Sequence, residues 1–162
     1  MLLAVVMPAL ALADPAPGYK VRMIESAAED AREAVAAGES PKQDCAMASM
    51  QSASVFDQHA DDDAAMAVAA EALEVCAYEV AVPYFDRLLD ATAAALAEDP
   101  ESPHPCNDFV SEFTVYFALI KDGPERVGED GEPLPTGEQR TAAALSEKAK
   151  AVCPFAAGMM GF

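Results

Sequence analysis

The chain has 162 residues, of which 52% are hydrophobic, and it carries a formal net charge of −18 at pH 7. This length and apolar fraction suffice for one domain with a buried core and exclude a globally disordered chain. The charge excludes nucleic acid as a partner, because phosphate binding requires a basic surface, and it disfavours anionic membranes. A basic protein or cations would be attracted to the chain. An acidic surface that only maintains solubility is the alternative.

The first residues have the pattern of a secretory signal peptide. An apolar run through Leu10 is followed by Ala-Leu-Ala at positions 11–13, which matches a cleavage site of the A-x-A type. The run is shorter than the roughly 20 residues that a membrane-spanning helix requires. We therefore expect a signal peptide at 1–13, a tether at 14–19 and a single helical domain at 20–162. These expectations describe a secreted or periplasmic protein whose mature chain has no membrane span.

Three helices are predicted in the first half of the domain, at about residues 20–37, at 41–58 and from 61 onward. Gly38 stands where the C-terminal cap of a helix needs a left-handed residue. The segment Ser40–Gln43 combines a serine N-cap, a proline at the first helical position and a glutamine at the third. This combination predicts a capping box at the start of the second helix.

The third helix contains a proline. Its apolar residues recur with alternating spacings of three and four, as on one face of a helix: Met66, Ala69, Leu73, Cys76 and Val80. Val82 would be a poor N-cap for a new helix, so Pro83 is expected to kink a helix that continues. The apolar stripe then extends to Pro100.

The densest apolar face of the chain follows Cys106. Val115 and Leu119 lie beside this face, and a helix so apolar is usually the central one of a bundle. An exposed partner site is the alternative. The face itself holds Phe109, Val110, Phe113, Tyr116, Phe117 and Ile120.

A long acidic loop at 122–137 separates this helix from the last one, where Thr136 and Gln139 predict a second capping box. The loop lacks the residue order of an EF-hand, so it is interpreted as solvated, and it is the part of its hairpin best suited to a function. No segment alternates with a period of two. The sequence therefore predicts an all-α protein, a five- or six-helix antiparallel bundle.

The four cysteines are predicted to form two disulfides. Export favours disulfides over reduced thiols or a zinc site. In antiparallel helices, residues equidistant from the turn lie at the same height. Only the pairing of Cys45 with Cys76 and of Cys106 with Cys153 places both midpoints in a predicted turn, the first at 59–63 and the second in the acidic loop. This pairing is preferred among the three possible connectivities.

Candidate metal ligands gather around the first of these turns. His59 with Asp61, Asp63 and the aspartate between them could provide nitrogen and oxygen ligands, although helix capping by aspartate is the alternative. Met47 and Met50 could provide soft ligands for Cu(I), although methionine more often fills a core.

No catalytic pattern is present in the sequence. The G-x-S-x-G, glycine-rich phosphate-binding and H-E-x-x-H patterns are absent, and cysteines in disulfides cannot act as nucleophiles. We therefore expect no enzyme and no cofactor. The leading hypothesis is a secreted or periplasmic helical binding protein that engages a basic protein through an acidic surface, as inhibitors, immunity proteins and accessory subunits do. The alternative is a periplasmic metal-binding protein that uses His59, the aspartates and the methionines.

Overall fold

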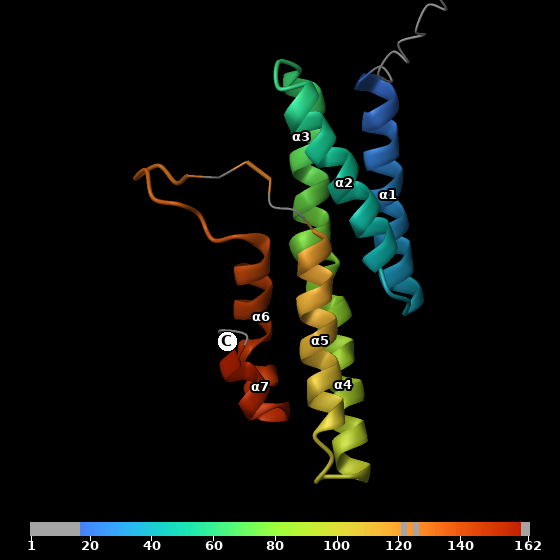
Figure 1. Ribbon diagram of the computed structural model, residues 1–162, viewed down its shortest axis with the longest axis vertical. Coiled ribbons are helices and arrows are strands. Elements are labelled where there is room, and N and C mark those ends of the chain that lie inside the picture. The colour runs from blue at the N-terminus through green and yellow to red at the C-terminus, as the bar shows by residue number, and fades with distance from the viewer. Residues whose placement is uncertain (1–16, 121–122, 125–126, 160–162) are drawn as a thin grey trace, which may run out of the picture.

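A computed structural model describes residues 17–120, 123–124 and 127–159, so the predicted signal peptide lies outside the described part. The described residues are mostly helical and form no strand, which confirms the all-α prediction. They contain five long helices and a short final one, because α3, η1 and α4 make one continuous run (Figure 1). The bounds are α1 Pro17–Ala37, α2 Lys42–Gln58, α3 Asp63–Glu74, η1 Val75–Glu79, α4 Ala81–Glu98, α5 His104–Leu119, α6 Gly137–Val152 and α7 Pro154–Met159.

The long α3–η1–α4 run organises the other helices. The pair α1 and α2 packs against α3, while α5 packs against α4 and α2 (Figure 1). The helix α6 packs along α4 and η1 rather than along α5, although the sequence predicted that these two helices would fold back on each other. Contacts between α6 and η1, described below, explain this difference. No helix within the described ranges is long and apolar enough to cross a bilayer.

Both predicted disulfides are present. The bond between Cys45 and Cys76 joins α2 to η1, with 5.4 Å between the Cα atoms. The bond between Cys106 and Cys153 joins the first turn of α5 to the end of α6, with 5.7 Å between the Cα atoms. The pairing inferred from the positions of the turns is therefore confirmed.

The helix starts agree only in part with the prediction. The first helix begins at Pro17, inside the predicted tether. Thr136 and Gln139 form the predicted capping box at the start of α6. The capping box predicted at Ser40 is wrong, because Pro41 is the N-cap of α2 and no side chain caps that end. The Ser40 hydroxyl accepts from the Lys42 amide at 3.4 Å rather than from the Gln43 amide, and it also interacts with Tyr84 of α4.

The helix around Pro83 continues, as predicted, through a π-helical turn. In η1 the Val80 amide donates to the Val75 carbonyl at 3.0 Å, one residue further back than in an α-helix. Proline has no amide hydrogen, so it interrupts the regular ladder at this point. The wide turn absorbs the interruption, and the Tyr84 amide resumes the α-helical pattern by donating to the Val80 carbonyl at 3.1 Å.

The core has two regions of different packing. Between α1, α2 and α3 it consists largely of buried alanines, which allow close helix approach, as the composition suggests. Between α4 and α5 it is aromatic and centred on Phe85 of α4, whose ring lies 4.9 Å from that of Phe113 and 5.2 Å from that of Tyr116. The aromatic face of α5 is therefore core, whereas Val115 and Leu119 beside it are 45% and 43% exposed.

Ser52 is a polar residue in the alanine-rich region, and it is completely buried on α2. Its hydroxyl has no hydrogen-bond partner among the described residues. Replacing Ser52 with alanine removes an unsatisfied polar group and improves helix propensity. We expect the free energy of unfolding to rise by up to about 1 kcal/mol in a urea titration. A loss of stability in this variant would contradict the assignment of the hydroxyl as unsatisfied.

Thr141→Val provides the matched control. Thr141 is also fully buried, but its Oγ1 donates to the Ala77 carbonyl at 2.7 Å. Removing this hydroxyl leaves a carbonyl without its donor. This substitution is expected to lower the free energy of unfolding by about 1 kcal/mol.

Candidate functional site

The π-helical turn η1 is the junction where the other helices meet. Its Cys76 is bonded to Cys45 of α2, and both cysteines are fully buried. The Tyr116 hydroxyl of α5 donates to the Cys76 carbonyl at 2.7 Å and lies 3.4 Å from the Cys45 sulfur. The π-helical turn departs from the regular hydrogen-bond pattern of an α-helix, and the Tyr116 hydroxyl supplies a donor to one of its carbonyls. The junction therefore positions α2 and α5 relative to each other.

The start of α6 is fitted closely against the same turn. A Cβ atom added to Gly137 would lie only 2.2 Å from the Ala77 Cβ, so the contact requires glycine. One turn later, Thr141 donates to the Ala77 carbonyl, as described above. The Arg140 guanidinium bonds to the Glu74 carboxylate at 2.5 Å and stacks over the Tyr78 ring, 4.8 Å from its centre. These contacts fix α6 on η1.

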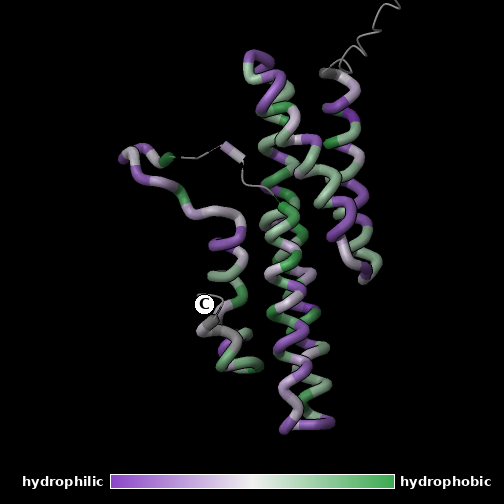
Figure 2. Tube along the Cα trace, in the orientation of Figure 1, coloured by the Kyte–Doolittle hydropathy of each residue, from purple (hydrophilic) through white to green (hydrophobic). Residues whose placement is uncertain are grey.

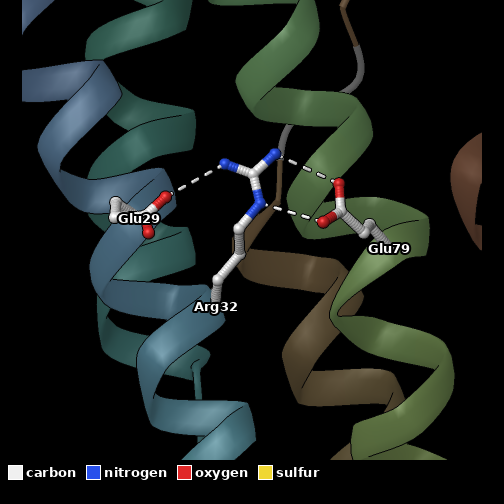
Figure 3. Close-up of polar contacts among 3 residues, drawn as sticks. All are labelled: Glu29, Arg32 and Glu79. Atoms are coloured by element: carbon white, nitrogen blue, oxygen red, sulfur yellow. Dashed lines mark hydrogen bonds and ion pairs between the residues drawn. The ribbon is translucent and has the colours of Figure 1, made fainter.

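An arginine from α1 holds the opposite side of the junction, as Figure 3 shows. Arg32 donates from Nε to Glu79 Oε1 at 2.9 Å and from Nη2 to Glu79 Oε2 at 3.1 Å (Figure 3). Its Nη1 also reaches Glu29, 3.4 Å away on α1. The hydrogen bond from Arg32 lowers the pKa of Glu79, and the same bond raises the pKa of Arg32. The pair is largely exposed, so its stabilising effect is small.

The buried hydroxyl of Tyr116 makes the junction sensitive to alkaline pH. Burial, with a smaller effect from Tyr84, raises the pKa of Tyr116 above its usual value. The unfolded chain therefore releases this proton at a lower pH than the folded chain does. The contribution to the free energy of unfolding is fully present below about pH 10 and is lost as the pH rises further.

This dependence gives a prediction for Tyr116→Phe. One such group changes the free energy of unfolding by about 1.4 kcal/mol per pH unit. The variant should lack this contribution to the pH dependence above about pH 10. Because burial also raises the pKa of Tyr84, a residual slope is expected. Urea titrations between pH 8 and pH 11 measure the effect. Parallel curves for the two proteins would contradict it.

A cavity of about 630 Å³ opens beside the junction, between α3, the end of α5 and the chain that enters α6. This volume is typical of ligand pockets. The lining combines apolar side chains with the Glu74–Arg140 pair. The buried Arg140 Nε has no hydrogen-bond acceptor among the described residues. Residues that line the cavity include Leu73, Phe117, Ile120, Pro135, Glu74 and Arg140.

An ordered arm, residues 127–134, projects from the mouth of this cavity. Its two sides meet at a bridge between Val127 and Pro133, and its tip is closed by a bond from the Gly128 amide to the Glu132 carbonyl at 2.8 Å. Gly131 has a φ of +81°, which favours glycine in this turn. Figure 2 shows that the arm is mostly hydrophilic and stands away from the helices. Its two large apolar residues, Val127 and Leu134, are 60% and 44% exposed.

The arm concentrates acidic charge that has no described counter-ion. Glu129, Asp130 and Glu132 lie at its tip, and no lysine or arginine of the described ranges pairs with them. Among the described residues, the Asp130 carboxylate accepts a hydrogen bond from the Glu132 amide at 3.2 Å. Seven of the eight lysines and arginines in the described ranges make contacts within the bundle, and Arg22 is the eighth; the seven are Lys20, Arg32, Lys42, Arg87, Arg140, Lys148 and Lys150.

A second hollow, of about 660 Å³, lies between α4 and α5 beside the start of α2. Glu112 accepts from Lys42 Nζ at 2.8 Å and from the Tyr84 hydroxyl at 2.9 Å. Burial raises the pKa of Tyr84, with a smaller contribution from Glu112. These groups satisfy one another, so the cluster is explained by its role in holding α2 on α4 and α5.

The predicted metal ligands are not brought together. Met47 and Met50 are 39% and 55% exposed on α2, and about nine residues of helix separate Met50 from His59. The helix α3 begins at Asp63, and its N-cap is Asp62, whose carboxylate accepts the Ala65 amide at 3.0 Å; Asp61 precedes the helix. Within the described ranges, no three His, Cys, Asp or Glu side chains form a group that could hold a metal ion.

The sequence identified the acidic loop but not the cavity at its base. The signal for the loop was its charge and its lack of an apolar period. The cavity depends on Leu73, Phe117 and Arg140, which come from three helices, and no local pattern links them. Gly137 directly follows the capping Thr136, and a glycine at the start of a helix can indicate that the helix lies very close to a neighbour, here Ala77 of η1.

Comparisons with protein-family models, with curated proteins and with solved structures find no match for the chain.

Proposed function

We propose that the chain is a secreted or periplasmic binding protein that engages a basic protein through the acidic tip of the arm. The observation that carries the proposal is the group Glu129, Asp130 and Glu132, which lies on an ordered, projecting turn without a described counter-ion. Carboxylates in this situation attract a cationic partner and fix its orientation, and no ion pair among the described residues is lost. The proposal assigns no reaction to the protein and no cofactor.

Two further properties support the proposal. The disulfides suit an oxidising compartment outside the cytoplasm. The exposed Val127 and Leu134 flank the acidic tip, and exposed apolar residues next to charged ones are a common composition for protein interfaces.

The test compares two variants with equal change in charge. The arm variant E129Q/D130N/E132Q removes the carboxylates of the tip, and the control E98Q/D99N/E101Q removes three exposed carboxylates from the end of α4 and the following turn. Binding to a lysine-rich peptide is measured by calorimetry at several salt concentrations. The arm variant should lose about tenfold in affinity and most of its salt dependence, whereas the control should lose much less. Equal losses in both variants would show that only the net charge matters and would overturn the proposal.

The metal-binding alternative stays a prediction: the buried His59 Nε2 has no hydrogen-bond partner among the described residues, but no ligand group forms around it. His59, Asp61, Asp63, Met47 and Met50 do not converge, as reported above, and the Asp62 carboxylate is used as a helix cap. A titration with Cu(I) or a divalent metal, repeated on His59→Ala, addresses this alternative directly.

A further inference from the structure

The cavity at the base of the arm adjoins the acidic tip, and this continuity carries an inference that rests on the proposed function. Pro133, Leu134 and Pro135 line the cavity and directly follow Glu132 in the chain. An extended chain advances about 3.3 Å per residue, so the carboxylate-bearing tip begins within about 10 Å of the cavity wall. A partner that contacts the tip is therefore within reach of the cavity.

We propose that the cavity receives an apolar side chain of the same basic segment that binds the tip of the arm. Leu73, Phe117 and Ile120 are apolar residues of the lining that such a side chain can contact. The volume of about 630 Å³ exceeds that of one aromatic ring and leaves room for the adjoining backbone. The partner segment thus carries a phenylalanine-sized or leucine-sized residue three or four positions from a lysine or arginine.

Arg140 lines the cavity as well, and its guanidinium is held by the Glu74 carboxylate and by the Tyr78 ring. Its Nε atom is shielded from solvent, so the entering segment makes no bond to this atom. The negative charge of the neighbouring tip selects a segment that is basic rather than acidic.

The test uses three short, capped peptides and two protein variants. The parent peptide has two lysines three and four positions before one phenylalanine; the second peptide has alanine in place of phenylalanine, and the third has glutamine in place of both lysines. Ala70→Phe is designed to fill the cavity from an exposed lining position without disturbing the core. Ala94→Phe adds the same ring at an exposed position of α4 outside the cavity and is the control.

Calorimetry should show that the parent peptide binds about tenfold or more tightly than the alanine peptide, and that Ala70→Phe removes this difference while Ala94→Phe keeps it. Salt-dependent binding of equal strength for the parent and alanine peptides would overturn the inference and leave the proposed function standing. Equal losses in Ala70→Phe and Ala94→Phe would also overturn it. If neither lysine peptide binds, or if the glutamine peptide binds as tightly as the parent, the proposed function itself fails.

Discussion

Replacing Gly137 with alanine is expected to lower the free energy of unfolding by about 3 kcal/mol. The added Cβ would lie 2.2 Å from the Ala77 Cβ and 3.2 Å from the Ala77 carbonyl oxygen, which is closer than van der Waals contact permits. The nearest obstacle is the Ala77 Cβ, and the Ala77 backbone lies directly behind it, so α6 must move away from η1. That movement also weakens the bonds from Thr141 to Ala77 and from Arg140 to Glu74.

Two companion variants identify the cause of this loss. Ala77→Gly removes the nearest atom, so the double variant A77G/G137A should be more stable than G137A alone, although each substitution by itself is destabilising. Gly158→Ala on α7 adds a Cβ that meets nothing within 4 Å, and it should be neutral or slightly stabilising. Urea titrations of the wild type, G137A, A77G and A77G/G137A measure the coupling between the two positions. If the loss of stability in the double variant equals the sum of the two single losses, the steric explanation is contradicted.

The second large effect is expected from the buried disulfide. The variant C45A/C76A should lose about 4 kcal/mol or more, because it opens a loop of 31 residues in the unfolded chain and also removes two fully buried sulfurs. The Tyr116 hydroxyl would lose its contact with the Cys45 sulfur at the same time. Such a loss is comparable with the whole net stability of a small domain. Thermal unfolding measured by circular dichroism should show a strongly lowered midpoint.

The other disulfide provides the comparison. The variant C106A/C153A should lose less, because Cys106 is only half-buried and the bond lies at the end of α6, away from the junction. The same difference in burial predicts the order of reduction in the native protein. Under mild reductant, alkylation followed by mass spectrometry should label Cys106 and Cys153 before Cys45 and Cys76. Labelling of the inner pair first would show that the junction opens more readily than the structure implies.

The cysteine pairing could be predicted because it depends on few physical facts. The rise of a helix and the position of a turn determine which residues lie at equal height, and both turns are marked by polar residues or prolines in the sequence. The capping box at Thr136 was predictable for a similar reason, since all its groups lie within four residues.

Features that depend on tertiary contacts were not predictable. Ser40 has the right neighbours for a capping box, but its hydroxyl accepts from the Lys42 amide and also interacts with Tyr84, which is 44 positions later in the chain. The sequence placed α6 beside α5, whereas Gly137 and Thr141 fit it to η1. The turn of the arm is formed by backbone hydrogen bonds such as that from the Gly128 amide to the Glu132 carbonyl. The acidic composition of the segment does not reveal such bonds, so the sequence predicted only a solvated loop.

The location of binding is the central claim, and hydrogen exchange with mass spectrometry tests it most directly. Amide exchange of the wild-type chain is compared without and with the lysine–phenylalanine peptide. Slower exchange is expected in fragments that cover the arm at 127–134, the start of α6 and the stretch 70–77. Slower exchange at the turn around Glu98–Glu101 instead, or an even change along the whole chain, would contradict it.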